Sequence, residues 1–134
     1  MKVKEFMKTK LENVQGDRSA YDAIEKMLDK RIRSLVVTPV GEEDVYGVVT
    51  ARDVVFKVLG ADLNPNDIKV SEIASKPVVC IDQDTKLSDA AALMKKFNIG
   101  RLFVCEGKTP IGIFTLTDAM YGSLILRARK GHVA

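Results

Sequence analysis

The chain has 134 residues, a net charge of +3, and 46% apolar against 29% charged residues, a balance typical of one compact domain with a sizeable core. No apolar run approaches the roughly 20 residues that a membrane span needs, and the first residues lack the apolar stretch of a signal peptide. We therefore expect a cytoplasmic protein without a membrane segment. The single histidine, His132, leaves little for histidine-based catalysis or metal binding.

The positive charge lies in the C-terminal half of the chain. Arg127, Arg129 and Lys130 together account for the net excess. Cations near the end of a helix suit the negative end of its dipole, whereas a basic patch can also bind nucleic acid. Three charges are thin support for the second interpretation, so we interpret 127–134 as a basic helix end and do not expect a nucleic-acid partner.

The two cysteines, Cys80 and Cys105, both lie in apolar, strand-like runs. Disulfides are uncommon in chains that are not secreted. The sequence therefore favours two buried free thiols, with a disulfide as the alternative.

The chain contains an internal duplication. A shift of 67 residues places 70–73 (Val-Ser-Glu-Ile) on 3–6 (Val-Lys-Glu-Phe), and the match continues through the following helix and strand. After the next turn, which is shorter in the second copy, the shift becomes 65 residues. It then superimposes Gly112 on Gly47, Thr115 on Thr50, and Asp118 on Asp53. A register that holds through both halves predicts a tandem repeat.

Each repeat predicts the same element order, β-α-β-β-α. In the first repeat the order is a strand over 11–14, an amphipathic helix over 20–28, strands over 35–37 and 45–49, and a closing helix over 51–59. In the second it is a strand over 78–81, a helix over 87–97, strands over 102–104 and 111–114, and a closing helix from 116 to about 130. We predict an α/β (α+β) fold of two repeats, 1–60 and 70–126, joined by a linker over 61–69. Because about 60 residues bury little alone, the repeats should share one core with pseudo-two-fold symmetry.

The junction of the last strand and the closing helix is the candidate site in each repeat. The strand ends in Thr50 or Thr115, and Asp53 or Asp118 falls on the first helical turn. A helix start offers N–H groups to a phosphate, and a carboxylate beside it can accept both hydroxyls of a ribose. The same Thr-x-x-Asp spacing is also that of a capping box. Nucleotide binding and a purely structural cap both remain open from the residues alone.

At these segments the chain resembles a tandem pair of cystathionine β-synthase (CBS) domains, a Bateman module, over roughly 1–59 and 68–123. The segments that carry the resemblance are 3–7, 31–37 and 47–53, with their counterparts 70–74, 98–104 and 112–118. The resemblance implies a regulatory or energy-sensing module that binds AMP, ADP, ATP or S-adenosylmethionine in clefts between the repeats, with no covalent cofactor. A homodimer formed through the helices and an unidentified regulated protein are implied as partners.

The resemblance also assigns roles to individual residues. Asp53 and Asp118 would hold ribose, and Thr50 and Thr115 would contact ribose or the first phosphate. Arg52, Thr117 and Arg101 would face phosphates, with Arg33 in the place of Arg101 in the first repeat, and Leu11 and Val78 would border the adenine. Because Arg52 carries a charge and Thr117 does not, we expect the Asp53 site to prefer more phosphates.

Two other classes of function remain. One is a homodimerisation scaffold without a ligand, and the other is nucleic-acid binding through the basic C-terminal helix. We do not expect an enzyme, because the sequence pairs no nucleophile with a base and contains no metal-ligand cluster or Walker-type loop. The closing helices carry more apolar residues than one core contact needs, which favours a subunit interface there.

Overall fold

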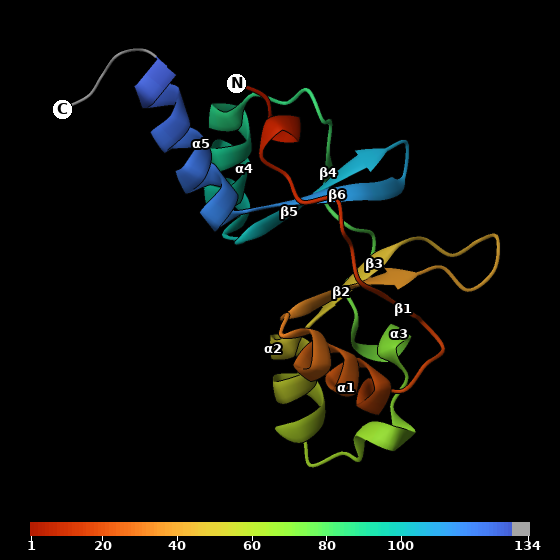
Figure 1. The fold of residues 1–134 in the computed structure, drawn as a ribbon. Coiled ribbons are helices and arrows are strands. Elements are labelled where there is room, and N and C mark those ends of the chain that lie inside the picture. The colour runs from red at the N-terminus through yellow and green to blue at the C-terminus, as the bar shows by residue number, and fades with distance from the viewer. Residues whose placement is uncertain (130–134) are drawn as a thin grey trace. The chain divides into compact units, whose positions relative to one another are not determined.

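The computed structural model describes residues 1–129 and divides the chain into two compact units (Figure 1). The β1–β3 unit comprises Glu12–Val78, and the β4–β6 unit combines Met1–Leu11 with the chain from Val79 onward. We predict a basic helix end over 127–134, and its residues 130–134 lie outside the described residues. Within the described part, no helix is both long and apolar enough to cross a membrane.

The β1–β3 unit has the predicted order of elements. They are β1 (Asn13–Gln15), α1 (Ala20–Lys30), β2 (Ser34–Thr38), β3 (Gly47–Thr50), α2 (Ala51–Val54), the π-helical turn η2 (Val55–Leu59), the short turn η3 (Pro65–Asp67) and α3 (Val70–Ile73). The sheet order is β1-β2-β3, with β1 parallel and β3 antiparallel to β2. The predicted closing helix is thus present, but its second half widens into a π-helical turn.

The β4–β6 unit repeats this arrangement. Its elements are η1 (Val3–Glu5), β4 (Cys80–Ile81), α4 (Leu87–Phe97), β5 (Arg101–Glu106), β6 (Thr109–Thr115) and α5 (Leu116–Arg129). The sheet order is β4-β5-β6, again with one parallel and one antiparallel pairing. The predicted α/β fold with two β-α-β-β-α repeats is therefore confirmed.

The segment that begins each repeat packs on the other repeat. The N–H of Val3 donates to the carbonyl of Thr85 at 2.9 Å, and the N–H of Val70 donates to the carbonyl of Arg18 at 2.8 Å. These two bonds coincide under the 67-residue shift, so the exchange is reciprocal. The linker that we predict over 61–69 therefore leads into a segment that completes the first repeat. The compact units consequently divide the chain differently from the repeats.

Buried apolar residues form one cluster in each unit. The β1–β3 cluster includes Leu35, Val37 and Val49 from the sheet, and also Val70 and Ile73 from the second repeat. The β4–β6 cluster is built in the same way. It contains Leu102, Val104 and Phe114 of the second repeat, and Val3 of the first. Each cluster thus contains residues of both repeats, so the repeats share their cores, but they form two clusters where we predict one.

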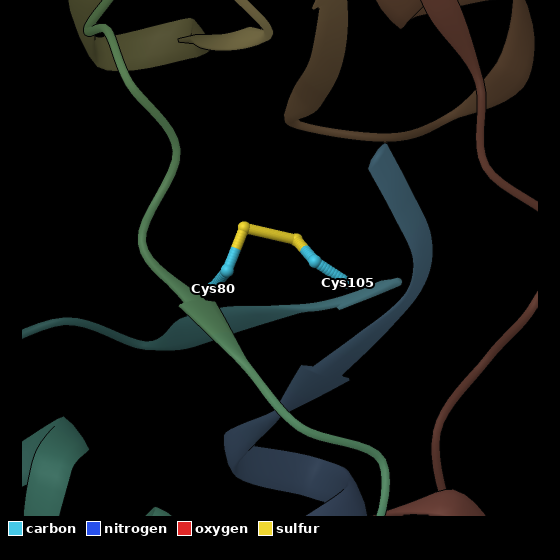
Figure 2. The surroundings of a disulfide bond; sticks show 2 residues. All are labelled: Cys80 and Cys105. Atoms are coloured by element: carbon cyan, nitrogen blue, oxygen red, sulfur yellow. A yellow bond between two sulfur atoms is a disulfide. The ribbon is translucent and has the colours of Figure 1, made fainter. Parts of the chain in front are cut away.

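The prediction of free thiols is wrong, because Cys80 and Cys105 form a disulfide (Figure 2). The parallel pairing places Cys80 of β4 opposite Phe103 of β5. Cys105 lies two residues further along β5 and therefore on the same face of the sheet. The two Cα atoms are 5.4 Å apart, within the range that a disulfide bridges. The sequence does not reveal this pairing because it depends on the register of two strands separated by a helix.

Candidate functional site

Threonine and aspartate form a capping box at the start of each closing helix. In the β1–β3 unit, the N–H of Thr50 donates to Asp53 Oδ2 at 2.9 Å, and the N–H of Asp53 donates to Thr50 Oγ1 at 3.1 Å. In the β4–β6 unit, the corresponding bonds between Thr115 and Asp118 measure 2.8 and 3.3 Å. Each threonine hydroxyl also donates to the same aspartate Oδ2. The capping interpretation is therefore confirmed, and one oxygen of each carboxylate is bound by its own main chain.

The other carboxylate oxygen contacts a lysine in each unit. Asp53 Oδ1 lies 2.9 Å from Lys57 Nζ, one helical turn away, and Asp118 Oδ1 lies 2.9 Å from Lys8 Nζ. Sequence reasoning missed both lysines. The spacing of four residues between Asp53 and Lys57 is a visible signal for an ion pair. Lys8 had no such signal, because it is 110 residues away from Asp118 and reaches it through the exchanged N-terminal segment.

The two aspartates are shielded from solvent and their lysines are not. The side chain of Asp118 is 7% exposed and that of Asp53 is 13% exposed, whereas both lysine side chains are at least half exposed. A carboxylate at such a position is retained only when its oxygens have partners. Of these partners, the exposed lysine ammonium is the one that another hydrogen-bond donor can replace without breaking the cap.

The basic residues expected near phosphates lie in different surroundings. Arg101 is opposite Thr115 in the register of β5 and β6, so it stands beside the junction. Arg33 is exposed, and its carbonyl accepts the N–H of Ala51 at the start of α2 at 2.9 Å. The guanidinium of Arg52 lies 4.7 Å from the centre of the Phe56 ring. Arg52 thus stacks on Phe56 of the following turn η2. The preference of the Asp53 site for more phosphates stays a prediction.

Leu11 and Val78 each lie in the unit that contains the aspartate of the other repeat. Val78 is buried in the unit that contains Asp53, and its N–H donates to the carbonyl of Tyr46 at 3.2 Å. Leu11 is half-buried and belongs to the unit that contains Asp118. Thr117 is exposed on the first turn of α5. The adenine role of Leu11 and Val78 stays a prediction.

A separate cavity lies between α4 and α5. Its volume is about 460 Å³, and none of the ten predicted site residues lines it. The lining residues are Met1, Lys2, Lys86, Leu87, Ser88, Ala91, Ala119, Ser123 and Leu126. In the part of the chain that the structure describes, no three or more histidine, cysteine or acidic side chains gather as a metal site.

Comparison with known proteins identifies a family in both repeats. The model of the CBS domain matches residues 3–60 and 70–123. An uncharacterised protein of Methanocaldococcus jannaschii is 31% identical over 106 residues, which cover 78% of this chain and 57% of that protein. A 33.4 kDa protein encoded in a ribosomal RNA operon of Thermofilum pendens is 32% identical over 130 residues, covering 90% and 43%. The chain thus spans about half the length of these curated relatives.

Solved structures show the same fold. A hexameric CBS-CP12 protein from bloom-forming cyanobacteria superimposes with a TM-score of 0.83 at 31% identity, covering 95% of this chain and 73% of that one. An uncharacterised conserved protein from Pyrococcus horikoshii superimposes with a TM-score of 0.78 at 28% identity, covering 91% of both chains.

Proposed function

Because the chain belongs to the CBS-domain family, we propose that it is a non-catalytic regulatory module that binds an adenosine-containing ligand at the Asp53 and Asp118 junctions. One observation supports this proposal above the others. At both junctions a shielded carboxylate is held in place by a cap, and its second oxygen contacts an exposed lysine ammonium. A ready acceptor of this kind beside a helix start suits a sugar-phosphate.

Binding would proceed by exchange of one partner of the carboxylate. The ribose hydroxyls donate to Asp118 Oδ1 in place of the Lys8 ammonium, while Thr115 keeps Oδ2 fixed. The displaced ammonium remains on a flexible stem close to the ligand, where a phosphate can pair with it. At Asp53, Lys57 would take the same role. Ligand binding would then favour the conformation of the chain in which these partners are arranged for it.

Thermal melting of the full chain with AMP, ADP, ATP or S-adenosylmethionine tests the proposal. A ligand at a hundredfold excess over its dissociation constant raises the free energy of unfolding by about 2.7 kcal/mol. Asp53→Asn and Asp118→Asn keep an acceptor for the cap and remove the charge, so calorimetric titration should lose one site with each variant. Asp22→Asn, at the start of α1, is the matched control and should keep both sites.

A ligand-free scaffold is the competing function, since the capping boxes alone explain why Thr and Asp recur. No rise in melting temperature with any of the four compounds at millimolar concentration would favour the scaffold. Mass spectrometry of small molecules that remain bound after purification provides an independent check.

We also propose that the chain self-associates through its closing helices. Large apolar side chains are exposed on both, with Phe56 of η2 at 60% and Met120 of α5 at 66%. Leu59 of η2 and Tyr121 and Leu124 of α5 are exposed as well. Exposed apolar patches of this kind mark interaction surfaces, and one structural relative with the same fold is a hexamer.

A further inference from the structure

The Cys80–Cys105 disulfide fastens the edge strand β4 to β5 where the backbone ladder is short. Strand β4 consists of two residues, and its pairing with β5 ends at Val104. On the other side of β5 the register to β6 shifts between Val104 and Cys105, and Cys105 then lies opposite Pro110. Proline has no N–H to donate. The disulfide therefore links the first residue of β4 to the residue of β5 that follows the last one paired with β4.

The β1–β3 unit holds the equivalent strands without a covalent bond. The counterparts of Cys80 and Cys105 under the 67-residue shift are Asn13 and Thr38. There β1 pairs with β2 over three residues, up to Thr38, and the Thr38 hydroxyl donates to the Val14 carbonyl at 3.4 Å. The N–H of Gly16 adds a further bond to the Thr38 carbonyl. The chain thus contains an internal control for the role of the disulfide.

The turn that follows β4 anchors the N-terminal segment. The N–H of Lys4 donates to the carbonyl of Gln83 at 3.1 Å. The carboxylate of Asp84 lies 3.0 Å from Lys4 Nζ and 3.3 Å from Lys2 Nζ. Lys4 first, and then Lys2, lower the pKa of Asp84 below its usual value. If β4 is held less firmly, the contacts of Gln83 and Asp84 with Lys4 and Lys2 should therefore also loosen, and with them the segment Met1–Leu11.

We propose that Cys80–Cys105 is a reversible thiol–disulfide switch that sets how firmly β4 and the N-terminal segment are held. Cys80 is exposed, whereas Cys105 is 9% exposed, so an incoming thiolate reaches Cys80 first. A dithiol attacks Cys80 Sγ, the S–S bond breaks, and Cys105 leaves as a thiolate that takes up a proton. The second thiol of the reductant then displaces Cys80 and closes a cyclic disulfide. Two electrons and two protons pass from the dithiol to the protein.

Hydrogen–deuterium exchange of the full chain, oxidised and then reduced with dithiothreitol, tests the switch without any nucleotide. Peptides over 79–86 and 1–11 should exchange roughly tenfold faster after reduction, because reduction removes the covalent link that restrains the unfolded chain between Cys80 and Cys105. Peptides over 12–18 and 34–38, which contain Asn13 and Thr38, should not change. A Cys80→Ser, Cys105→Ala double variant should exchange like the reduced protein and ignore dithiothreitol.

Three results would overturn the proposal. The first is alkylation of two thiols in the native, air-oxidised protein, since no bond would then exist to reduce. The second is a disulfide that withstands millimolar dithiothreitol in the folded state. The third is exchange that is equal in the two redox states, or that rises as much in 12–18 as in 79–86.

Discussion

At the scale of single residues, two glycines allow the exchanged segments to approach the sheets. Gly47 of β3 and Gly112 of β6 coincide in the two repeats, and both are buried. Val48 and Ser75 exchange backbone hydrogen bonds, as do Ile113 and Lys8. A Cβ atom at Gly47 would lie 2.8 Å from the carbonyl oxygen of Ser75, which is too close. The recurrence of glycine is visible in the sequence, and this contact gives its cause.

We expect Gly47→Ala to lower the free energy of unfolding by about 1–3 kcal/mol, because the added methyl group collides with backbone that cannot move freely. At Gly112 the nearest atom is the flexible Met7 sulfur, so Gly112→Ala should cost less. Gly100→Ala, whose Cβ would make ordinary contacts of 3.5 Å with Leu116, is the control. Chemical denaturation ranks the three variants, and equal losses for Gly47→Ala and Gly100→Ala would contradict the contact.

Asp44 contributes a pH-dependent part of the stability of the β1–β3 unit. Its carboxylate accepts the N–H of Val40 at 2.9 Å, two bonds from Lys76 Nζ at 2.9 and 3.0 Å, and the N–H of Val45. These bonds, with Val40 first, lower the pKa of Asp44 from 3.8 to about 2. Because the pKa is lower in the folded state, the carboxylate stabilises that state above pH 3.8. This contribution is lost as the pH falls towards 2.

Asp44→Asn should therefore be less stable than the wild type at pH 7, and the difference should narrow between pH 3.8 and about 2. Denaturant unfolding of both proteins across this range measures it. Glu43→Gln removes a charge from the same turn at an exposed position and serves as the control. A difference that stays constant down to pH 2 would show that the carboxylate charge is not its cause.

At the scale of elements, the sequence pattern predicts those features that depend on contacts between residues close together in the chain. The helices and their order follow from apolar spacing, and the Thr-Asp caps follow from residues three apart. The strand boundaries shifted, with β1 at Asn13–Gln15 and β4 starting at Cys80, because pairing with a distant strand sets them. The exchange of initial segments could not be predicted. Its contacts join residues such as Val3 and Thr85, and the intervening sequence carries no signal for them.

The candidate site likewise combines contacts between residues close in the sequence, which are predictable, with contacts between distant residues, which are not. Thr50 with Asp53 is a local pair, and it is where the sequence placed it. The Lys8–Asp118 contact and the Cys80–Cys105 bond both depend on which strands become neighbours. Pattern and spacing therefore identify the cap and its carboxylate. They do not identify the cation that covers it or the covalent bond across the sheet.

At the scale of the whole molecule, the exposed apolar faces of the closing helices need a partner. Phe56 and Met120 are each at least 60% exposed in the single chain, so neither is required for its core. A charge at either position would be buried in a subunit interface without a partner, which is costly. Phe56→Glu and Met120→Glu should therefore keep the fold and weaken association.

Sedimentation equilibrium of the full chain measures this effect. We expect the wild type to associate and each glutamate variant to raise the dissociation constant at least about tenfold, a modest effect for a residue at the centre of an interface. Val40→Glu, at an exposed apolar position in the turn between β2 and β3, is the control and should associate like the wild type. A wild-type chain that stays monomeric at high micromolar concentration would refute the interface. Equal weakening by Val40→Glu would instead attribute the effect to added negative charge, because all three variants share that charge.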